Sequence, residues 1–250
     1  MIDSISLIEG PEINFNEGID NMIKLYQFEI SPFCTKIALI LNVKEVPYQI
    51  IEVPVSKSYN VKNYSATSRL PAIEHEGKFI DDSTDIAYYL DGVFSDRPLI
   101  PADEKLWVKC HLYEDWADES LNFYMMKLRW LPQNKDRWSK ELAKFDSGLW
   151  RWLVTKFAPK AALNILDKQG VGRKSEQAAL RDIDRHMRAL TIDLQDGPFL
   201  VGSELSLADI SVYAQLKWIS ENPEGKAAID AHQNIIHWME RVDFATRRNV

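Results

Sequence analysis

The chain has 250 residues, of which 46% are hydrophobic and 27% charged, as is usual for a soluble globular protein. Its net charge of −7 argues against a nucleic acid or an anionic membrane surface as the main partner. No apolar run is long enough to span a bilayer, residues 1–18 lack the basic residues of a targeting peptide, and the presence of only two cysteines favours a cytoplasmic protein.

The N-terminal part of the chain alternates between strand and helix patterns. Residues 1–22 show no clear period and are expected to form an extension. The expected elements are, in order, strands at 24–28 and 48–53 around a helix at 33–43, a strand pair at 72–75 and 78–80, and a helix at 83–90. This order predicts a small mixed sheet with helices packed on it.

After a break that contains Gly92, Pro98 and Pro101, the pattern is helical only. Asp103 is a plausible N-cap of a long amphipathic helix, and Ser206 with Asp209 has the spacing of a capping box. The fold class expected is therefore α/β followed by all-α. The expected segments are an extension at 1–22, an α/β domain at 23–92, a linker at 93–103 and an all-helical domain at 104–250.

The run Ser31-Pro32-Phe33-Cys34 lies where the first strand gives way to the first helix. The first turn of a helix has free backbone N–H groups and the positive end of the helix dipole. Together with the Ser31 hydroxyl, these groups could hold a thiolate or another anion.

Two further segments could contribute to the same site. In Arg69-Leu70-Pro71, a cis proline directly before a strand would present the Leu70 backbone to a ligand instead of to the sheet. Asp82-Ser83 begins the next helix, where it could bind an amino-acid-like head group. Each segment alone is explained as a turn or a cap, but their order and spacing together indicate a ligand site.

With these motifs the sequence resembles the glutathione S-transferase family, and in particular its serine-type, bacterial-like members, from about Lys24 to Val242. The resemblance implies a thioredoxin-like N-terminal domain, an all-helical C-terminal domain, a two-fold homodimer, glutathione as co-substrate and a role in detoxification. It also implies that the Ser31 hydroxyl donates to the glutathione sulfur. The residues that it assigns to glutathione binding are Phe33, Arg69, Leu70, Pro71, Asp82 and Ser83.

The spacing Ser31-x-x-Cys34 is that of a redox Cys-x-x-Cys pair with serine at the exposed position. Because serine cannot form a mixed disulfide, dithiol oxidoreductase chemistry is disfavoured. We expect Cys34 and Cys110 to be packed thiols. Cys34 nevertheless leaves open a glutathione-dependent thiol transferase or peroxidase activity.

By the family's architecture, the electrophile would lie between the domains against the long helix. An aromatic and apolar wall would suit a hydrophobic co-substrate. The candidate wall residues are Tyr113, Trp116, Ala117, Ser120 and Tyr124. The acidic residues Glu114, Asp115, Asp118 and Glu119 are interpreted as a solvated or dimer-facing surface, and no His cluster at metal-ligand spacing predicts a metal site.

Two functions remain open at this point. The first is a glutathione transferase that conjugates small hydrophobic electrophiles. The second is a non-catalytic binding or assembly protein with the same fold. Residues 1–22 and 131–172 are less typical of the family and resemble its divergent metaxin-like branches. The complete Ser31, Pro71 and Asp82-Ser83 set favours the enzyme, and no membrane span or nucleic-acid surface is expected.

Overall fold

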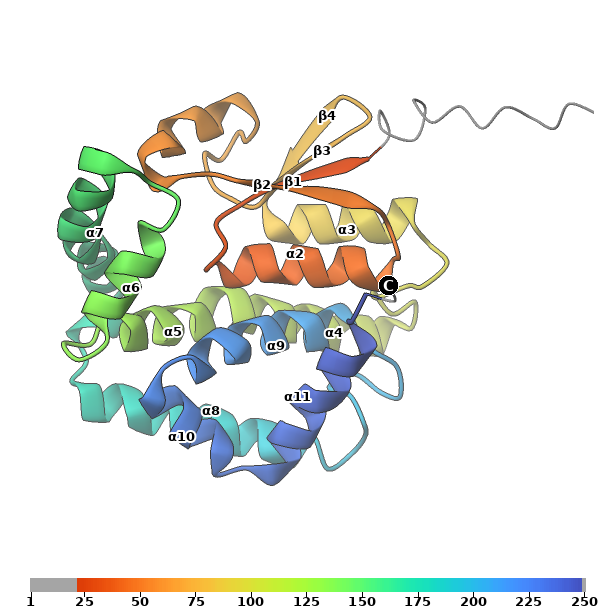
Figure 1. Cartoon of the computed structure of the whole chain (residues 1–250). Coiled ribbons are helices and arrows are strands. Elements are labelled where there is room, and N and C mark those ends of the chain that lie inside the picture. Colours follow the sequence, from red (N-terminus) through yellow and green to blue (C-terminus); the bar gives the residue numbers. More distant parts are fainter. Residues whose placement is uncertain (1–21, 249–250) are drawn as a thin grey trace, which may run out of the picture.

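The computed structural model describes residues 22–248, so the expected extension at residues 1–22 lies almost entirely outside the described residues. Figure 1 shows four layers: a sheet, two helices packed on one face of it, a middle layer of helices α4, α5 and α9, and an outer layer of α8, α10 and α11. The thioredoxin-like and all-helical parts expected from the sequence are therefore both present.

The sheet has the strand order β2-β1-β3-β4. Strand β1 is parallel to β2 and antiparallel to β3, and β4 is antiparallel to β3. The alternation of buried Ile23 and Leu25 along β1 places one face of the sheet on the core. In chain order the elements are β1 (Ile23–Gln27), α2 (Pro32–Val43), β2 (Tyr48–Glu52), η1 (Val55–Asn63), β3 (Ala72–His75), β4 (Lys78–Asp81) and α3 (Ser83–Val93).

All four predicted strands and both predicted helices of this part are present, within a few residues of their predicted ends. The 3-10 helix η1 was not predicted. Its sequence is polar, and only Val61 among its residues is buried, so it offers no apolar period to recognise.

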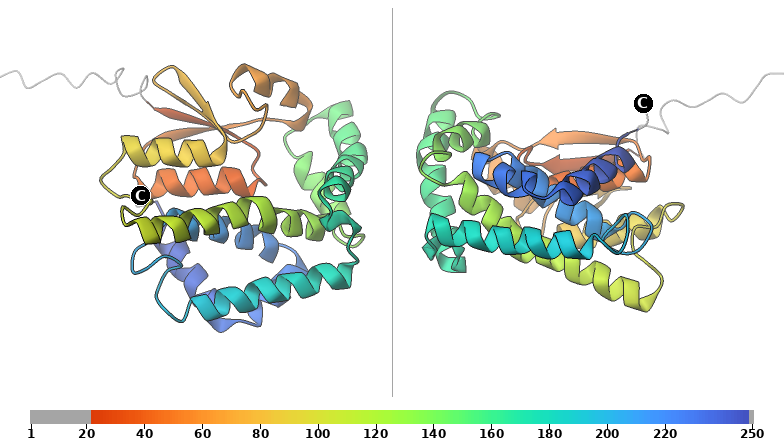
Figure 2. Two further views of the ribbon diagram at one scale, coloured as in Figure 1. Left: turned by 180° about the vertical axis from the view of Figure 1, so that it is seen from behind. Right: turned by 90° about the horizontal axis from the view of Figure 1, so that it is seen from below.

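The rest of the chain is helical, apart from an isolated β-bridge between Phe199 and Gly202. Helix α9 is the central element, because most of its side chains are buried between α2 on one side and the outer helices on the other (Figure 2). The helices are α4 (Glu104–Trp116), the π-helical turn η2 (Ala117–Leu121), α5 (Asn122–Arg129), α6 (Lys135–Leu142), α7 (Gly148–Gln169), η3 (Val171–Arg173), α8 (Glu176–Asp193), α9 (Leu207–Ser220), α10 (Pro223–Asp230) and α11 (Gln233–Ala245). Within residues 22–248, no helix is both long and apolar enough to cross a membrane.

Asp209 organises the start of α9. Its buried carboxylate accepts hydrogen bonds from the backbone N–H and the hydroxyl of Ser206, at 3.1 and 2.7 Å, which confirms the predicted capping box. The same carboxylate accepts from the Leu200 N–H and from the Trp238 indole, both at 2.8 Å. One side chain therefore ties together α9, the loop before it and α11.

We expect Asp209→Ala to lower the free energy of unfolding by at least about 3 kcal/mol, because it leaves several buried donors without an acceptor. A suitable control is Asp103→Ala, since Asp103 caps α4 at an exposed position and its loss should cost only about 1 kcal/mol. Urea unfolding followed by tryptophan fluorescence measures both losses. Equal losses in the two variants would contradict the role given to Asp209.

Candidate active site

A cavity of about 370 Å³ lies where the first helices of the two halves meet. It contains six of the residues predicted to bind glutathione: Phe33, Arg69, Leu70, Pro71, Asp82 and Ser83. The remaining lining residues are Phe28, Ser68, Thr84, Glu114, Asp115, Asp118 and Glu119. The structure thus brings together residues from three separate segments of the N-terminal half with an acidic stretch of the helical half.

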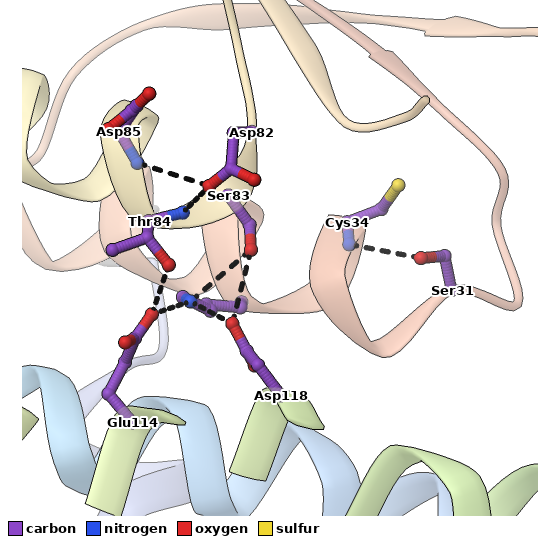
Figure 3. Close-up of polar contacts among 9 residues, drawn as sticks. Ser31, Cys34, Asp82, Ser83, Thr84, Asp85, Glu114 and Asp118 are labelled. Carbon is purple, nitrogen blue, oxygen red and sulfur yellow. Dashed lines mark hydrogen bonds and ion pairs between the residues drawn. The ribbon is translucent and has the colours of Figure 1, made fainter. Parts of the chain in front are cut away.

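Ser31 is the N-cap of α2, and Pro32 follows it in the first turn, where the missing N–H of proline costs nothing. The Ser31 hydroxyl accepts from the backbone N–H of Cys34 at 3.4 Å (Figure 3). Because a hydroxyl both accepts and donates, Ser31 can accept this bond and still donate its own proton to a ligand sulfur. Ser31 does not itself line the cavity, but Phe33 in the same helical turn does.

The loop before β3 presents Leu70 to the cavity. The Leu70–Pro71 peptide bond is cis, as predicted, and strand pairing in β3 begins only at Ala72. Asp81 of β4 holds this loop in place, because its carboxylate accepts from the Ser65 hydroxyl at 2.8 Å and from the Thr67 N–H at 2.7 Å. Arg69 is exposed at the rim of the cavity.

Asp82 caps α3, as predicted, and accepts from the backbone N–H of Thr84 at 2.9 Å. Its φ of 67° lies in a region that aspartate adopts more readily than most residues. Positive φ at a non-glycine residue often marks a functional site. The turn places the start of α3 at the cavity, where the Asp82 carboxylate takes up the N–H groups of Thr84 and Asp85.

The floor of the cavity is a buried charge cluster around Lys36 of α2. The Lys36 ammonium contacts Glu114 Oε1 at 2.5 Å and Asp118 Oδ2 at 2.7 Å, and lies 3.3 Å from the Ser83 hydroxyl. Figure 3 shows Ser83, Glu114 and Asp118 converging at this point. Thr84 donates to Glu114 at 2.5 Å. Oδ1 of Asp118 is also buried and takes part in none of these contacts.

The interpretation of the acidic stretch as a solvated or dimer-facing surface is wrong for two of its four members. Glu114 and Asp118 are buried, whereas Asp115 and Glu119 are exposed at the cavity. The reason is Lys36, whose charge compensates the two buried carboxylates. Sequence reasoning missed Lys36, although a lysine within the apolar face of a helix is itself a signal that a buried acidic partner exists.

The two buried carboxylates titrate differently. Burial raises the pKa of Asp118 to about 6 against the attraction of Lys36, and the neighbouring Glu114 charge adds to the rise. Burial also acts to raise the pKa of Glu114, but Lys36 and Thr84 hold it below its ordinary value. Asp118 is therefore the carboxylate of this pair that gains a proton first as the pH falls.

The five predicted wall residues do not line the cavity. The ring centroids of Trp116 and Tyr124 lie 5.4 and 5.2 Å from that of His186 on α8, and Ala117 is fully buried in the core. Tyr113 packs edge-on against Trp116, and Ser120 is only partly buried. These residues follow the apolar face of the long helix, which packs on α8, while its acidic face turns to Lys36 and the cavity.

Both cysteines are buried, as predicted. Burial raises the pKa of Cys34 to about 12 and that of Cys110 to about 11, so both thiols are protonated at neutral pH. Within residues 22–248, no group of three or more His, Cys, Asp or Glu side chains is arranged to hold a metal ion.

Arg129 is a second residue that sequence reasoning missed. It lies buried in α5, and its guanidinium donates to the carbonyl oxygen of Ile30 at 2.7 Å, one residue before Ser31. The guanidinium lies 4.3 and 4.9 Å from the ring centroids of Trp138 and Trp218. Burial lowers the pKa of Arg129 to about 9. The strand-to-helix corner is thus held from behind by the helical half.

We expect Lys36→Met to lower the free energy of unfolding by about 3–5 kcal/mol, because two buried carboxylates lose their counter-charge. Since the pKa of Glu114 is lowered in the folded state, the deficit should shrink as the pH falls below about 4.5 and Glu114 is protonated. Lys24→Met is the control, because the Lys24–Glu74 pair is only partly buried and is worth about 1 kcal/mol or less. Urea unfolding that shows equal losses would contradict this account.

Comparison with known proteins agrees with these features. The family model for the glutathione S-transferase N-terminal domain matches residues 25–98, and that for the C-terminal domain matches residues 161–241. A relative, the isoprene-epoxide–glutathione S-transferase of Rhodococcus sp. (strain AD45), is 23% identical over 86% of this chain and 92% of its own length. Glutathione S-transferase L3 of Arabidopsis thaliana is 30% identical, but over only 42% of this chain and 43% of its own length.

Among solved structures, the beta-etherase LigF from Sphingobium sp. strain SYK-6 has a TM-score of 0.68. It is 22% identical to this chain, and the match covers 89% of this chain and 95% of the beta-etherase. This similarity shows a shared fold. The two family models match parts of both halves, and the cavity lies where those halves meet. The chain therefore belongs to the glutathione S-transferase family.

Proposed function

We propose that this glutathione transferase joins the sulfur of glutathione, its co-substrate, to a small hydrophobic electrophile, and that Ser31 stabilises the reacting thiolate. The observation that carries the proposal is the single cavity into which Phe33, Leu70-Pro71 and Asp82-Ser83 converge. The N-terminus of α2 with the Ser31 hydroxyl lies at one end of this arrangement, and the start of α3 lies at the other.

The electrostatics support this orientation of glutathione. A free thiol has a pKa near 8.5, so at neutral pH only a small fraction is nucleophilic. A hydroxyl donor and the positive end of α2 would stabilise the thiolate and lower the pKa of the thiol. Cys34 accounts less well for the chemistry, since its buried thiol stays protonated.

The other end of the cavity suits the γ-glutamyl group. The backbone N–H and the hydroxyl of Ser83 would bind its carboxylate, and Arg69 would lie near the glycyl carboxylate. Asp118 adds a contact that the sequence did not suggest. Asp118 lines the cavity, and its negative charge would attract the ammonium group of the γ-glutamyl residue.

The proposed electrophile is small and apolar. Phe28, Phe33 and Leu70 give the cavity apolar surface. The Rhodococcus relative acts, by its name, on an isoprene epoxide, which is a compound of this class. With an epoxide, the thiolate forms the new C–S bond as the C–O bond breaks, and the resulting alkoxide takes a proton from solvent.

We also propose a cytoplasmic homodimer that acts in detoxification. Exposed apolar side chains on α4 support the dimer, because single chains rarely leave so many large apolar groups on one helix in water. They are Leu106, Trp107, Val108 and Leu112. Light scattering of the purified protein tests this assembly.

We expect Ser31→Ala to reduce kcat/KM for conjugation by about 10-fold or more, a loss of ~1.4 kcal/mol in transition-state stabilisation. The pH at which the rate is half-maximal should also rise toward the pKa of the free glutathione thiol. Cys34→Ala is the matched control one helical turn away, and it should keep its activity. An active Ser31→Ala together with an inactive Cys34→Ala would assign the chemistry to Cys34 instead.

We expect S-methylglutathione, which has no titrating thiol, to bind more weakly as the pH falls through about 6, because Asp118 then loses its negative charge. Calorimetric titration measures this dependence. Asp118→Asn should bind more weakly at pH 7.5 and lose the inflection, while Glu119→Gln, at the exposed end of the acidic stretch, should keep it. An unchanged inflection in Asp118→Asn would remove Asp118 from the site.

A further inference from the structure

Helix α7 has an exposed apolar face that the proposed reaction does not use. The helix runs along one edge of the molecule and contacts η1 (Figures 1 and 2). Leu149 is 70% exposed, Trp150 59% and Trp152 55%. Phe157, Leu163 and Ile165 are exposed on the same helix.

The arrangement of α7 explains why these side chains are uncovered. Its buried positions, Val154, Ala162 and Leu166, are spaced by eight and four residues and so form one side of the helix. With 3.6 residues per turn, Leu149, Trp152 and Leu163 lie on the side of the helix away from these buried positions. Among residues 22–248, no element covers this side.

The charge of this region is opposite to that of the chain as a whole. Helix α7 carries the basic residues Arg151, Lys156, Lys160 and Lys168 and one acidic residue, Asp167. The neighbouring segment 53–73, which includes η1, carries Lys57, Lys62 and Arg69 and no acidic residue. Lys57, Lys62, Lys156 and Lys160 are all exposed. We call α7 and η1 together the basic–aromatic surface.

We propose that the basic–aromatic surface docks onto a lipid bilayer that contains anionic lipids, with α7 lying in the interfacial layer. Tryptophan rings favour that layer, and exposed leucine, isoleucine and phenylalanine side chains gain free energy by entering the acyl region. Lysines next to them can contact lipid phosphates, each contributing favourably near an anionic surface. The Lys156 ammonium already lies 4.7 Å from the Trp152 ring centroid and 5.7 Å from that of Phe157, so its stem and the rings share one surface.

Two observations favour a bilayer over other partners. The aliphatic side chains Leu149 and Leu163 do not suit a nucleic acid, whose phosphates and bases bind charged and aromatic groups. A second copy of the same surface would bring like charges together. The net charge of −7 does not oppose docking, because the acidic residues lie outside α7 and η1 except for Asp167.

Flotation of the full chain with vesicles tests the proposal. Vesicles of phosphatidylcholine alone are compared with vesicles that also contain phosphatidylglycerol, at low and high salt. We expect binding to the anionic vesicles only, weakened by salt. Trp150→Ser/Trp152→Ser and Lys156→Glu/Lys160→Glu should each reduce partitioning by about 10-fold or more, without changing conjugation activity in solution.

Matched controls lie on other faces of the molecule. Phe244→Ser removes an exposed aromatic ring from α11, and Lys78→Glu/Lys105→Glu reverses two exposed charges away from α7. Both should bind vesicles like the unaltered protein. The proposal is overturned if the chain does not bind anionic vesicles, or if the α7 variants and the controls bind alike. It is also overturned if the α7 variants change the oligomeric state in light scattering, because the surface would then be an interface between copies.

Discussion

The buried ammonium of Lys36 joins the two halves of the chain beneath the cavity. A charge removed from water must be compensated nearby, and here Glu114 and Asp118 compensate it across the boundary between the two halves of the chain. This requirement fixes which face of α4 and η2 turns toward α2 and α3. It also leaves the opposite, apolar face free to pack on α8. Fold and cavity thus follow from the same ion cluster.

As a result, the two ends of the cavity differ in the charge that they favour. At the end of the cavity near α2, Ser31 and the helix N-terminus favour an anion, and Arg129 steadies the corner through the Ile30 carbonyl. At the other end, Asp118 lines the cavity, and its negative charge favours a cation. Glutathione carries its thiolate on the central cysteine and its ammonium group at the γ-glutamyl end, so these two charges match this difference. The segment 131–172 also has a role here, since Trp138 stacks on Arg129 and Lys144 pairs with Glu29.

The sequence predicted the features that depend on local rules. The caps Ser31, Asp82 and Asp103, the cis Leu70–Pro71 bond and the capping box at Ser206 each follow from the chemistry of a few adjacent residues. Features that depend on residues far apart in the sequence were not predicted. The acidic stretch was assigned to solvent because Lys36, about 80 residues earlier, is not apparent as its partner. The wall residues were placed at the cavity because apolar residues suit a hydrophobic ligand, yet they suit the core against α8 equally well.

In the proposed complex, one cavity holds glutathione with its sulfur at Ser31 and its γ-glutamyl end at Asp82-Ser83. A crystal structure of the protein with glutathione bound tests this arrangement. We expect the sulfur within hydrogen-bonding distance of the Ser31 hydroxyl, about 3–3.5 Å for a sulfur acceptor, and the ammonium group next to Asp118. Glutathione bound in another cavity, or with its sulfur turned away from Ser31, would contradict it.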